Sequence, residues 1–178
     1  MAEEWRGRIG GMSKERIDRF LATDMLCRLA VIKPDGSPYV IPVWYQWDGE
    51  ALWFVGRERS EWCRFIKANP KVSVVVDAVG ELVIDGEKFA IPKVFFEGEA
   101  EVVEEPNVGG RWVAVAEEMS IRYFGPNGPS YLDSTRNQPR WLIRMKPTRM
   151  RSWEGVGWSP KYWVEGTGGP SYEEVHGR

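Results

Sequence analysis

The chain is poor in histidine and cysteine. Among its 178 residues there is one histidine, His176, in a polar stretch near the C-terminus. Catalytic Ser/His arrangements, histidine acid–base chemistry and His-ligated metals therefore lack material, and we expect no metal site. Two cysteines, Cys27 and Cys63, are too few for a disulfide framework, so we expect free thiols.

Long apolar runs and an excess of basic charge are also missing. The apolar stretch at 72–76 has the length of a strand, and the first residues lack the apolar core of a signal peptide. We therefore expect a cytoplasmic protein without a membrane segment. A formal net charge of −2 and a pI near 5.6 oppose bulk binding to nucleic acid.

The size and composition are those of one globular domain, with 43% hydrophobic residues. We expect a loose leader at 1–12, a single domain at 13–165 and a polar tail at 166–178. Ten tryptophans stand out, because large flat apolar side chains favour binding of planar ligands.

The pattern of turns and apolar residues predicts a mainly β protein with short helices. A barrel of about six antiparallel strands is expected, because strands do not alternate with helices. Residues 26–33, 38–47 and 51–56 read as a three-stranded meander, followed by strands at 71–77, 93–105 and 140–153. Helical patterns cover 13–23, with Ser13 as the expected N-cap, and also 60–68 and 106–123. A weak hairpin pattern covers 78–91, and Gly98 suggests a bulge or bend in the strand at 93–105.

The junction at 55–64 is the first candidate site. Gly56 permits close backbone approach, Ser60 offers a hydroxyl at a helix N-terminus, and three arginines (Arg57, Arg59 and Arg64) add positive charge. These are the ingredients of a phosphate site. The alternative is that Ser60 only caps the helix and the arginines are solvated, which Glu61 in the first turn favours.

The strand at 38–47 is the second candidate. Pro42 cannot donate a ladder hydrogen bond, so it indicates a sheet edge whose backbone groups at Ile41, Val43 and Trp44 pair with a planar heterocycle. The alternative is an ordinary edge strand with Trp44 and Tyr45 packed on the core or on a second subunit. Lys93 and Trp153 are further candidates, with solvation and packing at the barrel end as their alternatives.

Five segments in one order resemble a known family. They are LAVIKPDGSPYVIPVWYQWDGEALWFVG, a Ser-initiated helix ending in Asn-Pro, KVSVVVD, FFEGEAEVV and RMKPTRMRSWEG, within residues 13–155. This succession resembles the pyridoxamine 5′-phosphate oxidase-like family of FMN-binding split β-barrels. The resemblance implies a partly closed barrel and a homodimer with two flavin sites at the subunit interface.

The resemblance also implies where a cofactor binds. Ser60 matches the Ser of the family's Ser-Arg-Lys phosphate motif, whereas Glu61 and Trp62 depart from it, so nearby arginines must compensate. Lys93 would reach the flavin from the neighbouring subunit, and Trp153 would lie near the ring. The residues expected at the cofactor are Val40, Ile41, Pro42, Val43, Trp44, Tyr45, Val55, Gly56, Arg57, Arg59, Ser60, Trp62, Arg64, Lys93 and Trp153.

These observations predict an FMN-dependent oxidoreductase acting on a small planar substrate, with no catalytic side chain. Vitamin B6 oxidation is not expected, because Ser159, Pro160, Lys161 and Trp163 stand where the family has substrate-binding arginines and a histidine. Three alternatives remain: a deazaflavin-dependent reductase, a non-catalytic flavin-binding or storage protein, and a nucleic-acid-binding barrel. The last is suggested by the basic residues Arg140, Arg144, Lys146, Arg149 and Arg151.

Overall fold

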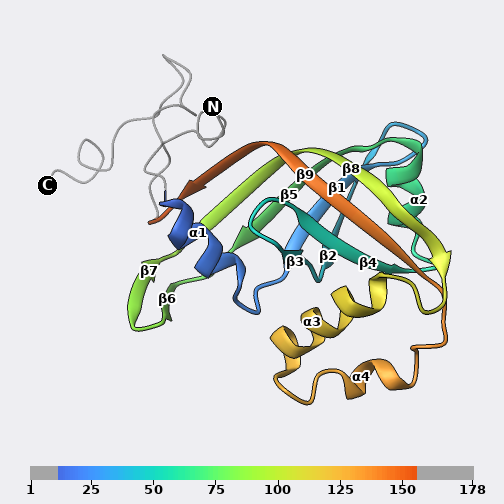
Figure 1. Ribbon diagram of the computed structural model, residues 1–178. Helices are drawn as coiled ribbons and strands as arrows, with labels where there is room; N and C mark the ends of the chain where they lie inside the picture. The colour runs from blue at the N-terminus through green and yellow to red at the C-terminus, as the bar shows by residue number, and fades with distance from the viewer. Residues whose placement is uncertain (1–11, 156–178) are drawn as a thin grey trace, which may run out of the picture.

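An antiparallel sheet of seven strands organises the chain (Figure 1). The computed structural model describes residues 12–155. In chain order the strands of this sheet are β1 (Cys27–Ile32), β2 (Pro38–Val43), β3 (Gln46–Trp47), β4 (Leu52–Arg57), β5 (Lys71–Asp77), β8 (Lys93–Asn107) and β9 (Arg140–Trp153). They lie side by side in the order β2-β1-β5-β8-β9-β4-β3.

The predicted strand at 38–47 is two strands. β2 pairs with β1 at one edge of the sheet, whereas β3 pairs with β4 at the opposite edge. The prediction of a continuous meander and of six strands is therefore wrong. Trp44 and Tyr45 connect the two edges, so the sheet must curl until the edges approach each other. This arrangement is consistent with a split barrel.

Other predicted elements are confirmed with small shifts. β6 (Glu81–Ile84) and β7 (Glu87–Ala90) form the hairpin expected within 78–91. Gly98 sits at a register shift between β8 and β9, where an added Cβ would lie 2.9 Å from the carbonyl oxygen of Lys146. The bulge suggested by this glycine is thus present.

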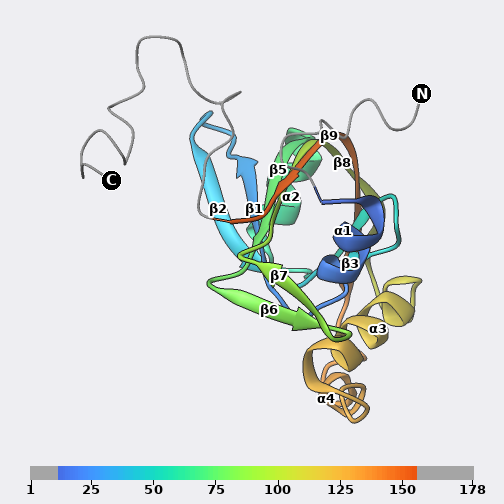
Figure 2. The same ribbon diagram turned by 90° about the vertical axis from the view of Figure 1, so that its left-hand side faces the viewer.

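The helices lie outside the sheet (Figures 1 and 2). α1 (Lys14–Leu21) begins after Ser13, whose hydroxyl accepts from the Arg16 amide at 3.2 Å, so this predicted cap is confirmed. α2 (Glu61–Ala68) follows β4, while α3 (Trp112–Phe124) and the short α4 (Ser130–Asp133) lie between β8 and β9. α3 starts later than expected because β8 continues to Asn107. No helix within residues 12–155 is both long and apolar enough to cross a bilayer.

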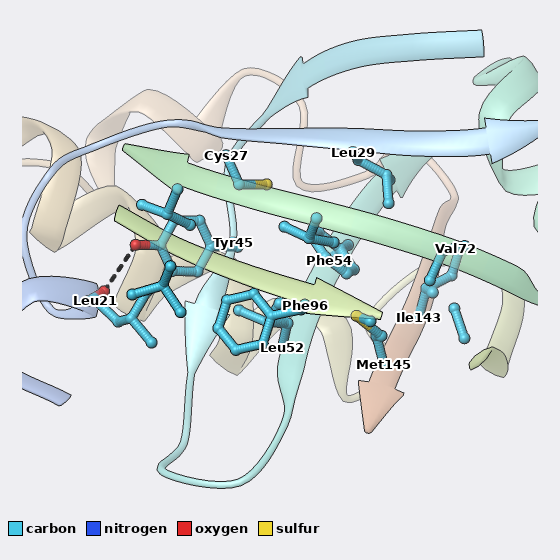
Figure 3. Packing of buried hydrophobic residues seen from close by; sticks show 14 of the residues in the cluster. Leu21, Cys27, Leu29, Tyr45, Leu52, Phe54, Val72, Phe96, Ile143 and Met145 are labelled. Atoms are coloured by element: carbon cyan, nitrogen blue, oxygen red, sulfur yellow. Dashed lines mark hydrogen bonds between the residues drawn. The ribbon is translucent and has the colours of Figure 1, made fainter. Parts of the chain in front are cut away.

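Two apolar clusters stabilise the fold. The larger fills the inner face of the curled sheet with side chains such as Leu29, Phe54, Phe96 and Ile143 (Figure 3). The smaller joins α3 and α4 to β9 through Trp112, Ala116, Leu132 and Leu142. α3 and α4 therefore cover the outer face near the start of β9.

Gly56 lets α2 pack closely on β4. A Cβ at this position would overlap Sγ of Cys63 and lie 3.1 Å from the Trp62 ring. Cys63 is fully buried and Trp62 is 6% exposed, so neither side chain has room to move away. The close approach of helix and strand depends on the missing side chain.

We expect Gly56→Ala to lower the free energy of unfolding by about 1–3 kcal/mol, because it overpacks this contact. Urea denaturation measures the effect. In a Cys63→Ala background the same substitution should cost less, since the overlapping sulfur is gone. Equal costs in the two backgrounds would show that Cys63 is not the obstacle.

The two cysteines are buried free thiols, as expected. Burial raises the pKa of Cys27 to about 12, and it raises the pKa of Cys63 as well. In the unfolded chain the pKa of a cysteine thiol is about 8.5. Above that pH the unfolded chain releases protons that the folded chain keeps, so the free energy of unfolding falls as pH rises.

We therefore expect the ionisation of Cys27 to lower the free energy of unfolding by about 2 kcal/mol when the pH rises from roughly 7.5 to 10. Denaturation under reducing conditions at both pH values, for the wild type and Cys27→Ala, measures the contribution. The variant should lose less stability with rising pH than the wild type does. Identical pH dependence in the two proteins would contradict the prediction.

Candidate functional site

A cavity of about 350 Å³ lies where the curled sheet is open. This volume falls in the range of small-ligand pockets, roughly 300–1,000 Å³. Its walls come from the end of β2, the end of β4, the start of α2 and the α3–α4 segment. The lining residues are Leu26, Pro42, Val43, Trp44, Val55, Gly56, Arg57, Ser60, Trp62, Ala116, Met119, Tyr131, Leu132 and Arg140.

Two strand edges border this cavity. β2 ends the sheet on one side, as the proline at position 42 predicted. On the other side β3 pairs only with Leu52 and Trp53, so the cavity-lining residues Val55, Gly56 and Arg57 have a ladder partner only in β9. Backbone N–H and C=O groups along an unpaired edge are suited to bind the polar rim of a planar ligand.

The start of α2 supplies the polar end of the cavity. Ser60 is the N-cap residue of α2, but its side chain makes no capping hydrogen bond, so its hydroxyl is not used for the helix. Arg57 and Ser60 both line the cavity. The first N–H groups of α2 have no acceptor within the helix and point out of the N-terminal end of α2. Ser60, Arg57 and the helix N-terminus together suit an anion.

The other two arginines of this junction lie elsewhere. Arg59 and Arg64 are exposed and do not line the cavity, and Glu61 is exposed as well. Trp62 does line it, as a largely buried ring in edge-to-face contact with Phe54 at 6.4 Å. The structure therefore gives the cavity an apolar wall where the family motif has a lysine.

Arg140 is a lining residue that the sequence analysis placed only in a basic strand. Its side chain is 7% exposed, its Nη2 donates to Thr135 Oγ1 at 2.7 Å, and its guanidinium lies 5.3 Å from the centre of the Trp112 ring. Burial, with the neighbouring Arg57 guanidinium, lowers the pKa of Arg140. The alternation along β9 predicts that Arg140 and Trp141 lie on opposite faces of the strand. Nothing in the sequence shows that β4 is the neighbour of β9 or that Arg140 pairs with Arg57.

Trp44 and Tyr45 have different surroundings. The Trp44 ring stacks on Tyr123 at 4.7 Å and contacts Phe124 and Tyr131, so it forms a wall tied to the α3–α4 segment. Tyr45 is fully buried and does not line the cavity, and its hydroxyl donates to the Leu21 carbonyl at 3.0 Å (Figure 3). The alternative that these two residues pack on the core holds for Tyr45.

Four more expected residues do not line this cavity: Val40, Ile41, Lys93 and Trp153. Lys93 and Trp153 face each other in the β8–β9 ladder, and Lys93 Nζ donates to the carbonyls of Ile91 and Gly155 at 2.7 and 2.8 Å. Trp153 and Arg140 are the two ends of β9, roughly 40 Å apart along the strand. One chain alone does not bring Lys93 and Trp153 to this cavity.

The basic residues of β9 do not form a continuous positive surface. Arg144 pairs with Glu101 at 2.7 Å, and both Arg149 and Arg151 lie within 4 Å of Glu97. These carboxylates of β8 neutralise much of the charge that suggested nucleic-acid binding. Within residues 12–155 no group of three or more His, Cys, Asp or Glu side chains is placed to hold a metal ion. His176 and the stretch from Ser159 to Trp163 lie outside the described residues, as does most of the expected leader and all of the expected tail.

Solved structures with the same fold include mycobacterial proteins. The conserved hypothetical protein Rv2991 from Mycobacterium tuberculosis is 28% identical, with a TM-score of 0.67 over 86% of this chain and 98% of its own. A structure described as an F420 reductase is also 28% identical, with a TM-score of 0.52 over 74% of this chain and 92% of its own. The FAD and heme binding protein from Mycobacterium smegmatis, 20% identical with a TM-score of 0.62, covers 83% of this chain and 73% of its own and shows the fold alone.

Comparison with the curated proteins gives no match. The family model described as pyridoxamine 5′-phosphate oxidase matches residues 13–154. That range includes every lining residue of the cavity and all the strands and helices described above. The chain therefore belongs to the pyridoxamine 5′-phosphate oxidase family.

Proposed function

We propose that this protein is a flavin-dependent oxidoreductase that binds FMN in the opening of its sheet. The observation that carries the proposal is the cavity itself, where open edges of β2 and β4 meet an uncapped helix N-terminus. A planar ring with a polar rim and a phosphate needs both features at once.

Different lining residues would contact the phosphate, the polar rim and the faces of the flavin ring. Ser60 and Arg57 would hold the phosphate, and backbone groups of Val43, Val55 and Gly56 would pair with the polar rim of the ring. Apolar lining side chains, among them Trp62 and Met119, exclude water from the ring. A bound flavin supplies hydride or electron transfer, so the protein needs no acid or base of its own for that chemistry.

A second copy of the chain completes the site in this proposal. Lys93 and Trp153 lie far from the cavity of their own chain. The family resemblance nevertheless assigns Lys93 to the neighbouring subunit's flavin and places Trp153 near the flavin ring. Val40 is 61% exposed on the edge strand β2, and an apolar side chain on an open edge favours contact with another chain. The active form is accordingly a homodimer.

A deazaflavin cofactor is the second candidate. The 28% identity with the structure described as an F420 reductase favours it, as do Glu61 and Trp62 in place of the two basic residues of the phosphate motif. A non-catalytic flavin-binding protein would use the same cavity, so only turnover separates it from an enzyme.

Titration of ligand-free protein with FMN tests the proposal by flavin absorbance and fluorescence. We expect saturable binding of FMN that weakens about 10-fold in Ser60→Ala, because the hydroxyl loses its phosphate contact. Arg149→Gln, which removes an exposed arginine of β9, should bind as the wild type does. Saturation by a deazaflavin but not by FMN would establish the second candidate, and binding of neither would overturn both.

Turnover decides between an enzyme and a carrier. With FMN bound, a saturable rate of electron transfer from a reduced nicotinamide to an artificial acceptor is expected. A protein that binds FMN and shows no saturable rate with either nicotinamide would be a flavin-binding or storage protein.

Light scattering of the FMN-loaded protein tests the homodimer. A mass of two chains at micromolar concentration is expected. A Trp153→Ala variant should remain folded and weaken FMN binding, because the ring would lose a contact from the neighbouring subunit. The mass of a single chain together with full FMN affinity would contradict the shared site.

A further inference from the structure

Two arginines that line the cavity lie opposite each other in the sheet. Arg57 ends β4 and Arg140 begins β9, and the two are direct partners in the antiparallel ladder. Directly opposed like charges destabilise a sheet, and the cost grows where one of them is buried.

The buried partner has unused hydrogen-bonding capacity. Arg140 is 7% exposed and gives Nη2 to Thr135 Oγ1, but its Nε is fully buried and has no hydrogen-bond partner within residues 12–155. Arg57 is the charged side chain opposite Arg140 in the ladder, and within residues 12–155 no carboxylate forms an ion pair with Arg140. Arg140 also lines the cavity, so a ligand there can offer an acceptor to a guanidinium whose donors are not all used within residues 12–155.

Further donors line the same cavity. The Ser60 hydroxyl is not used as a cap, and the N-terminus of α2, a helix of eight residues, begins at the next residue. Two guanidinium groups, a hydroxyl and a helix N-terminus form a set that suits an oxyanion with several acceptor oxygens. A phosphate monoester carries about −1.5 to −2 charges at neutral pH and matches the two fixed positive charges.

We propose that Arg140 and Arg57, together with Ser60, form an oxyanion site for a terminal phosphate monoester. Arg140 takes the place of the basic residues that Glu61 and Trp62 do not provide. This rests on the proposed function where the phosphate is that of the flavin. A phosphorylated substrate would present the same group, so the test separates the two sources.

The first arm compares FMN with riboflavin, which has the same ring and no phosphate. Arg140→Gln should weaken FMN binding about 10- to 100-fold and change riboflavin binding less than about threefold, because only the phosphate loses a charged donor. Arg149→Gln removes the same charge from the same strand outside the cavity and should bind both ligands as the wild type does. Arg57 is only half-buried, so Arg57→Gln is the second variant if Arg140→Gln fails to fold. It should likewise weaken FMN binding much more than riboflavin binding.

The second arm needs no flavin and measures the thermal midpoint in inorganic phosphate against chloride at equal ionic strength. We expect phosphate to raise the midpoint of the wild type and of Arg149→Gln, and to leave Arg140→Gln unchanged. If the wild type shows this response but binds no flavin, the oxyanion site stands with a phosphorylated substrate, and the proposed flavin function fails.

Two results would overturn the oxyanion site while leaving flavin binding intact. One is equal loss of FMN and riboflavin in Arg140→Gln, which would show a structural role for this arginine. The other is unchanged FMN affinity in both Arg140→Gln and Arg57→Gln. A wild type that responds to neither FMN nor phosphate would overturn both proposals.

Discussion

The fold depends on the burial of one side chain at the point where a strand breaks. Tyr45 is completely enclosed by the core, and its hydroxyl donates to the Leu21 carbonyl at the end of α1 (Figure 3). Arg122 Nη1 donates to the same carbonyl from α3, and its guanidinium lies 4.4 Å from the centre of the Tyr45 ring. An unmade hydrogen bond at a buried tyrosine is costly, so this arrangement holds the chain in one position between β2 and β3.

That position creates the opening. Residues 38–43 extend one edge of the sheet and residues 46–47 extend the other, with Trp44 and Tyr45 between them. The curled sheet therefore closes through a covalent connection rather than through a complete ladder. Backbone groups next to the connection keep no strand partner, and a cavity forms beside them.

The segment between β8 and β9 turns this opening into an enclosed site. α3 and α4 bring Ala116, Met119, Tyr131 and Leu132 to the cavity wall and cover the outer face of β9 at Leu142. The same cover buries Arg140 beside Trp112. A buried guanidinium N–H without an acceptor is costly in free energy, so Arg140 is stabilised when an acceptor binds. Arg149 on the same strand is exposed and lies beside Glu97, so it carries no such cost.

The sequence by itself determined the local elements and part of the site. Turn residues, the Ser13 cap and apolar periodicity located α1, α2, the hairpins and the long strands, because these signals act over a few residues. Pro42 located a sheet edge, and the succession of motifs indicated the family. Only the tertiary structure decided that residues 38–47 divide between two edges, that Arg59 and Arg64 lie outside the cavity and that Arg140 lies within it. These features depend on which strands become neighbours and on what the helices cover, and contacts between residues such as Arg57 and Arg140 leave no local pattern in the chain.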